Sequence, residues 1–171
     1  MRTISLLAHP VHPLSEVRDI TVFLQQDGAN LQLHYLLQGQ IDRLRLPPPA
    51  TPVRRDGLWQ TTCFELFIRT GETSYEEYNF APSGEWAHYR FADIRKRIED
   101  DTDTAQPDIL VERTDTRLQL QVSVPLPAGA IALGLCAVVD TIDGGLGYWA
   151  LHHPATQPDF HHFDAFALRL A

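Results

Sequence analysis

Residues 17–38 read VRDITVFLQQDGANLQLHYLLQ, and this stretch decides the fold class. Apolar side chains recur at every second position on both sides of the turn signal Asp27-Gly28-Ala29-Asn30: Ile20, Val22 and Leu24 before it, and Leu31, Leu33, Tyr35 and Leu37 after it. Such alternation is typical of β-strands that bury one face. The stretch therefore predicts an antiparallel hairpin.

Similar strand-like runs fill most of the remaining chain. They cover residues 62–69, 75–81, 85–91, 108–113, 117–124, 131–140, 146–151 and 163–170. Only residues 91–101 indicate a short helix, because Ile94 and Ile98 are four apart. About ten short strands without intervening helices predict an all-β antiparallel sandwich, immunoglobulin-like or jelly-roll. Between them, the proline-rich residues 40–60 form a long loop, and long loops are often functional.

Composition limits the possible partners and the cell compartment. The 171 residues fit a single domain spanning 1–171, and a net charge of −8 argues against a nucleic-acid partner. No apolar run approaches the length of a membrane span, and the short one at the N-terminus ends at His9-Pro10 without a cleavage signal. We expect a cytoplasmic protein in which Cys63 and Cys136 are buried thiols.

The hairpin around Ala81-Pro82-Ser83-Gly84 predicts which side chains share a face of the sheet. A turn centred on Pro82-Ser83 places Asn79 opposite Trp86, Glu77 opposite His88 and Tyr75 opposite Arg90. With Glu65 on the preceding strand, one outer surface would carry Glu65, Glu77, Asn79, Trp86, His88 and Arg90. This surface is either an ordinary solvated face with a Glu77–His88 pair or a ligand platform of aromatic and polar side chains.

Three segments carry a resemblance to a known family. Residues 55–68 (RDGLWQTTCFELFI), residues 78–86 (YNFAPSGEW), and residues 148–154 with 158–164 (YWALHHP and PDFHHFD) resemble the DOMON-like proteins of bacteria. These proteins are relatives of family 9 carbohydrate-binding modules. Together the matching segments span most of the chain from residue 55 onward.

The resemblance implies a β-sandwich and sugar binding. In the carbohydrate-binding relatives two tryptophans clamp a terminal sugar, and Trp59 and Trp149 match them here. An indole packs against the C–H face of a sugar, while polar side chains hold its hydroxyls. The haem-binding DOMON domains use a methionine and a histidine as axial ligands, and the sole methionine of this chain is Met1. No haem or other cofactor is therefore expected.

Four histidines and two acids lie close together near the C-terminus: His152, His153, Asp159, His161, His162 and Asp164. Their spacing fits no zinc motif, so hydrogen bonds that fix a loop are the favoured interpretation, with a ligand-binding edge or a metal site as alternatives. Nucleophile elbows, P-loops, dinucleotide fingerprints and HExxH motifs are absent from the sequence.

The sequence as a whole predicts non-catalytic binding of a carbohydrate or similar polar small ligand, without metal or membrane. The predicted ligand-binding residues are Trp59, Glu65, Asn79, Trp86, Arg90 and Trp149. Two alternatives stay open. One is a metal-dependent or carboxylate-based enzyme that acts on a sugar, with Glu65 and Glu77 as the paired carboxylates. The other is a protein-interaction domain that uses the same polar sheet.

Overall fold

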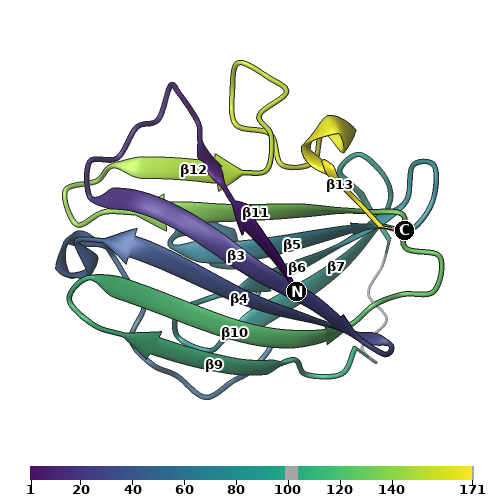
Figure 1. The fold of residues 1–171 in the computed structure, drawn as a ribbon, viewed down its shortest axis with the longest axis horizontal. Helices are drawn as coiled ribbons and strands as arrows, with labels where there is room; N and C mark the ends of the chain where they lie inside the picture. The colour runs from purple at the N-terminus through teal and green to yellow at the C-terminus, as the bar shows by residue number, and fades with distance from the viewer. Residues whose placement is uncertain (99–103, 171) are drawn as a thin grey trace.

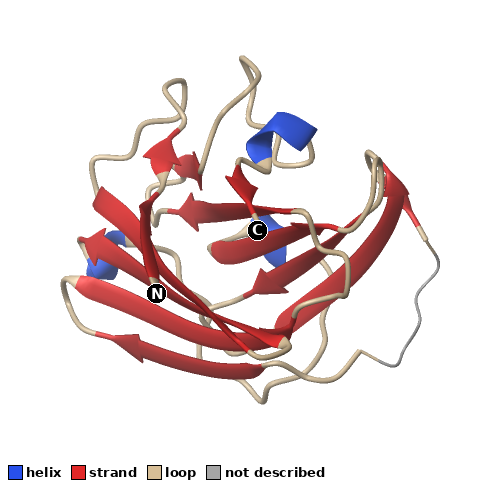
Figure 2. Cartoon of the chain, turned by 45° about the vertical axis from the view of Figure 1, so that its right-hand side comes forward, coloured by secondary structure: helices blue, strands red, loops and turns tan. Residues whose placement is uncertain are grey.

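A computed structural model describes residues 1–98 and 104–170 and shows two antiparallel sheets packed face to face (Figures 1 and 2). The predicted β-sandwich is thereby confirmed. The five-stranded sheet has the order β1-β3-β4-β10-β9. Its strands are β1 (Arg2–Ser5), β3 (Val17–Asp27), β4 (Asn30–Gly39), β10 (Arg117–Pro125) and β9 (Asp108–Arg113).

The second sheet has eight strands in the order β2-β12-β11-β5-β6-β7-β8, with β13 paired to β11. They are β2 (Leu7–Ala8), β12 (Leu146–Ala150), β11 (Ala132–Asp140), β5 (Cys63–Arg69), β6 (Tyr75–Phe80), β7 (Trp86–Asp93), β8 (Lys96–Arg97) and β13 (Leu168–Arg169). The described helices are three single 3₁₀ turns, η1 (Ile41–Arg43), η2 (Leu58–Gln60) and η3 (Phe163–Ala165). None of them is long and apolar enough to cross a membrane.

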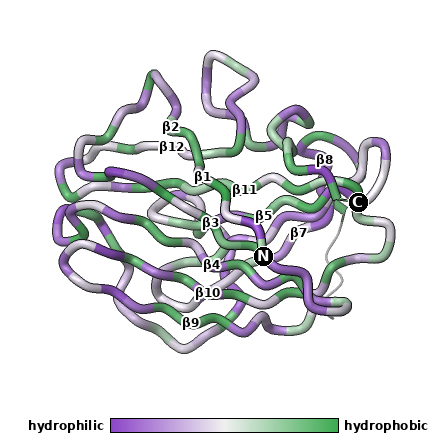
Figure 3. Tube along the Cα trace, in the orientation of Figure 1, coloured by the Kyte–Doolittle hydropathy of each residue, from purple (hydrophilic) through white to green (hydrophobic). Residues whose placement is uncertain are grey.

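The main hydrophobic core fills the space between the two sheets. Alternate residues of β3, β4 and β10 are buried in it. Figure 3 shows the hydropathy of the residues along these strands. Polar residues between them face outward, because this sheet has one face in solvent. Phe64, Leu66 and Ile68 of β5 supply the opposite wall of the core.

The eight-stranded sheet is buried on both faces in its centre. β5 and β11 are buried along almost their whole length, because two irregular segments cover the outer face. These segments place Leu58, Phe160 and Phe166 over Phe67 and Cys136 and form a second hydrophobic layer. Cys63 and Cys136 both lie in this layer as free thiols, as predicted.

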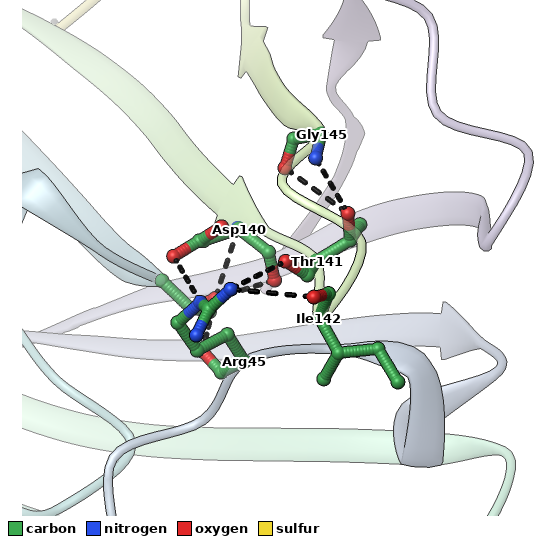
Figure 4. Close-up of polar contacts among 6 residues, drawn as sticks. Arg45, Asp140, Thr141, Ile142 and Gly145 are labelled. Atoms are coloured by element: carbon green, nitrogen blue, oxygen red, sulfur yellow. Dashed lines mark hydrogen bonds and ion pairs between the residues drawn. The ribbon is translucent and has the colours of Figure 1, made fainter.

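The first covering segment, residues 44–62, is tied to the end of β11 at both of its ends. Arg45 pairs with the carboxylate of Asp140 at 3.1 Å and donates to the carbonyls of Thr141 and Ile142, as Figure 4 shows. The hydroxyl of Thr62 lies 3.0 Å from the carbonyl of Arg45 and accepts the N–H of Asp140. This double attachment fixes the path of the proline-rich loop and positions η2 over the sheet.

The hairpin register differs from the prediction by one residue. Phe80 pairs with Trp86, Tyr78 with His88 and Glu76 with Arg90. The predicted turn had two residues, but Gly84 adopts φ 92° and extends it to three, with Ala81 donating to the carbonyl of Glu85. One extra turn residue turns every later side chain of β7 to the other face.

Two elements near the ends of strands also differ from the prediction. Within the described part of residues 91–101, β7 runs on to Asp93 and turns tightly into β8, so the predicted helix is wrong there; residues 99–101 lie outside the described part. The predicted strand 163–170 is a strand at Leu168–Arg169 alone, because η3 occupies its first three residues.

Candidate functional site

A cleft of about 910 Å³ lies between the outer face of the eight-stranded sheet and the segments that cover it. This volume suits a small ligand. The sheet contributes Glu65, Glu77, Tyr89, Phe91, Val138, Leu146 and Tyr148; the covering segments contribute Asp56, Gly57, Trp59, Gln60, Pro158, Phe160 and His161; and the β7–β8 region adds Arg95 and Arg97.

Two buried glutamates line the cleft on neighbouring strands. Glu65 of β5 pairs in register with Asn79 of β6, and Phe67 pairs with Glu77, so the two carboxyls are diagonal neighbours on one face. Glu65 is 3% exposed and Glu77 is 5% exposed. Side chains of this kind are costly to bury unless they are paired or serve a ligand.

The hydrogen bonds of this face leave acceptors unused. The amide of Asn79 donates to Glu77 Oε1 at 3.0 Å, while Asn79 Oδ1 is buried without a partner. Among the described residues, the Glu65 carboxyl has no hydrogen bond, although its backbone carbonyl accepts the hydroxyl of Tyr35. Unsatisfied buried acceptors in a cleft point to a ligand that brings hydrogen-bond donors.

Burial raises the pKa of both glutamates. Desolvation is the main cause at Glu65, whose pKa lies well above its ordinary value, and the charge of Glu77 adds to it. Burial raises the pKa of Glu77 to about 7, although the Asn79 hydrogen bond and the guanidinium groups of Arg95 and Arg97 act in the opposite direction. Titratable groups with such shifts are frequent at functional sites.

Hydrogen bonds through the Tyr75 hydroxyl position His161 of the covering segment beside Glu77. The backbone N–H of Arg95 donates to the Tyr75 hydroxyl at 3.0 Å, and this hydroxyl lies 2.7 Å from Nδ1 of His161. The Tyr75 hydroxyl can donate to Nδ1 or accept from it, and Nε2 of the same ring lies 3.7 Å from Glu77 Oε2. Burial lowers the pKa of His161 to about 4, so the ring is neutral near pH 7.

Charged and aromatic side chains form the mouth of the cleft. Arg95, whose backbone adopts φ 57°, pairs with Asp159 at 2.9 Å. The guanidinium of Arg97 lies 4.2 Å above the ring of Tyr89, and the Tyr89 hydroxyl donates to Asp56 at 2.8 Å. The indole of Trp59 is 52% exposed here, so the mouth presents a flat apolar surface beside polar groups.

The structure brings together three of the six predicted ligand-binding residues. Trp59 and Glu65 line the cleft, and Asn79 lies on the same face beside Glu65. Trp86 and Trp149 lie in the core between the sheets instead, so Trp59 and Trp149 do not form the expected clamp. Arg90 pairs with Glu76 in the observed register, so it lies on the opposite face from Glu65 and Glu77.

The same register change corrects the predicted ion pair. His88 contacts Glu76 at 2.9 Å rather than Glu77. The face of Glu65 and Glu77 is not a solvated surface, because the covering segments bury it.

The tertiary fold also delivers residues that were not predicted as ligand-binding: Tyr89, Arg95, Arg97, Tyr148 and Phe160, together with His161, which the sequence named only as part of the histidine cluster. Alternation gave a usable signal for Tyr148, because it must face away from the core when Trp149 faces into it. Arg95 and His161 come from a turn and a loop, where no periodic signal exists.

Most of the C-terminal histidines fix loops, as the favoured interpretation expected. His153 Nε2 contacts the carbonyl of Leu7 at 2.7 Å, His152 contacts the carbonyl of Asp164, and His162 accepts the N–H of Asp164. Only His161 faces the cleft. Within residues 1–98 and 104–170, no three His, Cys, Asp or Glu side chains gather in a way that would hold a metal ion.

A second groove, of about 710 Å³, lies on the five-stranded sheet and is more open. Phe23, His34, Leu110 and Gln121 are among its lining residues. His34 is hydrogen-bonded to Gln119, and no buried carboxyl lines the groove. The cleft over the eight-stranded sheet is therefore the stronger candidate site.

Comparison with known proteins gives the class of the fold. The structure is similar to the crystal structure of a putative carbohydrate-binding protein from Bacteroides uniformis, with a TM-score of 0.70 and 14% sequence identity. The match covers 99% of this chain and 84% of that protein. The chain thus has the β-sandwich fold of that protein. No family model matches the chain, and no curated protein matches it.

Proposed function

We propose that the protein binds a carbohydrate or a similar polar small ligand, without catalysis, in the cleft over the eight-stranded sheet. The observation that carries this proposal is the carboxyl of Glu65, which is buried, faces the cleft and has no hydrogen-bond partner among the described residues. Sugar hydroxyls are donors that would satisfy it. The exposed indole of Trp59 offers the flat surface on which a sugar ring packs.

Two further points support the same proposal. The fold is similar to that of a putative carbohydrate-binding protein. The segment of residues 55–68, which resembles the DOMON-like proteins, contributes both Trp59 and Glu65 to the cleft. Membership of that family, related to family 9 carbohydrate-binding modules, is part of the proposal, as is a cytoplasmic location.

The test is a binding screen against mono- and oligosaccharides that follows tryptophan fluorescence and the thermal midpoint. Trp59 is the exposed indole, whereas Trp86 and Trp149 are 5% and 3% exposed, so a ligand in the cleft should change the emission of Trp59. The proposal would be contradicted if no sugar of the panel, at millimolar concentration, changed either the fluorescence or the thermal midpoint.

Replacement of Trp59 by alanine is expected to weaken binding of a sugar found in that screen about tenfold, because the stacking surface is lost. Isothermal titration calorimetry measures the change. The matched control is Phe23→Ala, which removes an aromatic side chain from the groove on the other sheet. An unchanged affinity in Trp59→Ala together with a loss in Phe23→Ala would move the binding site to the five-stranded sheet.

One observation favours a carboxylate-based enzyme as the second candidate. Glu77 has a pKa raised to about 7 and lies beside Glu65, and such a carboxyl can serve as a general acid near neutral pH. Incubation with nitrophenyl glycosides distinguishes the two functions. Release of nitrophenol that is abolished in Glu77→Gln would support the enzyme, whereas intact glycosides with measurable binding support the non-catalytic proposal.

A further inference from the structure

The floor of the cleft offers acceptors in excess of donors. The Glu65 carboxyl and Asn79 Oδ1 have no hydrogen-bond partner among the described residues. The amide of Asn79 donates to Glu77, and Nε2 of His161 lies 3.7 Å from the same carboxyl. In their charged forms these two carboxyls only accept hydrogen bonds, so a ligand group that brings N–H or O–H donors suits them best.

Around the floor, the two glutamates lack a directly paired cation within residues 1–98 and 104–170. Arg95 pairs with Asp159, and Arg97 lies 4.0 Å from Asp56, so each guanidinium already faces an aspartate. No ion pair among the described residues joins an arginine or lysine to Glu65 or Glu77. The two glutamates thus form a place for positive charge that the described part of the protein does not fill.

A primary ammonium group matches both requirements better than a hydroxyl. It carries three N–H donors on one atom and a full positive charge, whereas a hydroxyl brings one donor and no charge. Hydrogen bonds between an ammonium and a carboxylate are about twice as strong as neutral ones. A bare Ca²⁺ ion would need six to eight oxygen ligands, whereas Glu65 and Glu77 supply only two neighbouring carboxyls.

We propose that Glu65 and Glu77 hold the ammonium group of an amino sugar whose ring packs against Trp59. This inference rests on the proposed function and names its ligand class. The amino group enters the floor, and the remaining hydroxyls lie towards the mouth, beside Asp56, Arg95 and Arg97. An N-acetylated sugar is excluded, because acetylation removes the charge and two donors.

Binding of an ammonium should release protons. Burial raises the pKa of both carboxyls when the cleft is empty. The other titratable groups that face them or line the cleft are Cys63, Cys136, Tyr35, Tyr75, Tyr89, Tyr148, His161, Asp56, Arg95 and Arg97. A cation between the carboxyls favours their charged forms. The affinity should therefore rise with pH between 4.5, the ordinary pKa of a glutamate, and about 7.

The experiment compares glucosamine, glucose and N-acetylglucosamine by isothermal titration calorimetry with the full chain. We expect glucosamine to bind at least about tenfold more tightly than the other two. Titrations in two buffers with different ionisation enthalpies should show proton release with glucosamine alone. Glu65→Gln and Glu77→Gln should each abolish the preference, while Glu112→Gln, an exposed carboxylate on β9, should retain it. Thermal unfolding of each variant verifies that it is folded.

Each outcome is decisive. Equal affinities for glucosamine and glucose overturn the ammonium site while leaving sugar binding in place. If neither these three sugars nor any sugar of the wider panel binds, the proposed function is overturned together with the ammonium site. If CaCl₂ competes with glucosamine for the wild-type protein and Ca²⁺ also binds directly, the site is one for a divalent cation and the amino-sugar assignment is overturned.

Discussion

Replacement of Trp149 by alanine is expected to lower the free energy of unfolding by about 3–5 kcal/mol. Its indole is 3% exposed and lies in the core between the two sheets. Removal of so large a buried side chain leaves a cavity that the surrounding strands cannot fill, because interiors are closely packed. Urea denaturation followed by circular dichroism measures the change.

Trp59→Ala is the matched control for that variant. Trp59 is half exposed at the mouth of the cleft, so its loss should change the free energy of unfolding by less than about 1 kcal/mol. If Trp59→Ala were strongly destabilising and Trp149→Ala neutral, the assignment of Trp59 to the cleft and Trp149 to the core would be reversed. Stability and sugar affinity thus separate the two tryptophans that the family resemblance treats as a pair.

The fold could be predicted from the sequence because the five-stranded sheet has one face in solvent. Its strands β3, β4 and β10 alternate between buried and exposed residues, and that alternation is visible in the sequence. The eight-stranded sheet gives a weaker signal. β11 is buried on both faces and reads as a continuous apolar run, which indicates burial without indicating which residue faces which way.

The site could be predicted in part, and one extra residue in the β6–β7 turn made the predicted positions on β7 wrong. Glu65 and Asn79 were placed on the correct face, because β5 and β6 each alternate without interruption. The same reasoning failed across Gly84, where a three-residue turn replaced the expected two-residue turn and moved Trp86, His88 and Arg90 to the other face. The letters APSG in fact favour the longer turn, because Pro82 cannot adopt the positive φ that a two-residue hairpin turn needs and Gly84 suits the left-handed third position.

The remaining cleft residues depend on tertiary contacts. Arg95 is positioned by a tight turn with a left-handed backbone, and its N–H reaches Tyr75, twenty positions earlier. His161 reaches the same hydroxyl from a loop that is separated from it by 86 positions. Periodicity carries no information about such contacts, so a sequence pattern could indicate the histidine cluster but not which histidine faces the cleft.

The buried glutamates should make the folded protein less stable as the pH rises. Because the pKa of Glu77 is raised from 4.5 to about 7 in the folded state, the folded protein binds more protons than the unfolded chain within that range. The stabilisation is present in full below pH 4.5 and is lost as the pH rises through 7. We expect Glu77 alone to remove about 3 kcal/mol across this window, with Glu65 acting in the same direction.

Glu77→Gln should remove the contribution of Glu77 to that pH dependence, because glutamine keeps a carbonyl oxygen for the amide of Asn79 and does not titrate. Urea titrations of both proteins at several pH values should show the variant as the more stable one near pH 8, with a flatter profile between pH 4.5 and 7. Glu85 and Asp93 have lowered pKa values, so their contributions are lost only in more acidic solution, outside this window. Parallel profiles for the wild type and Glu77→Gln would contradict burial of an uncompensated carboxyl, and with it the idea that the floor of the cleft awaits a positively charged ligand.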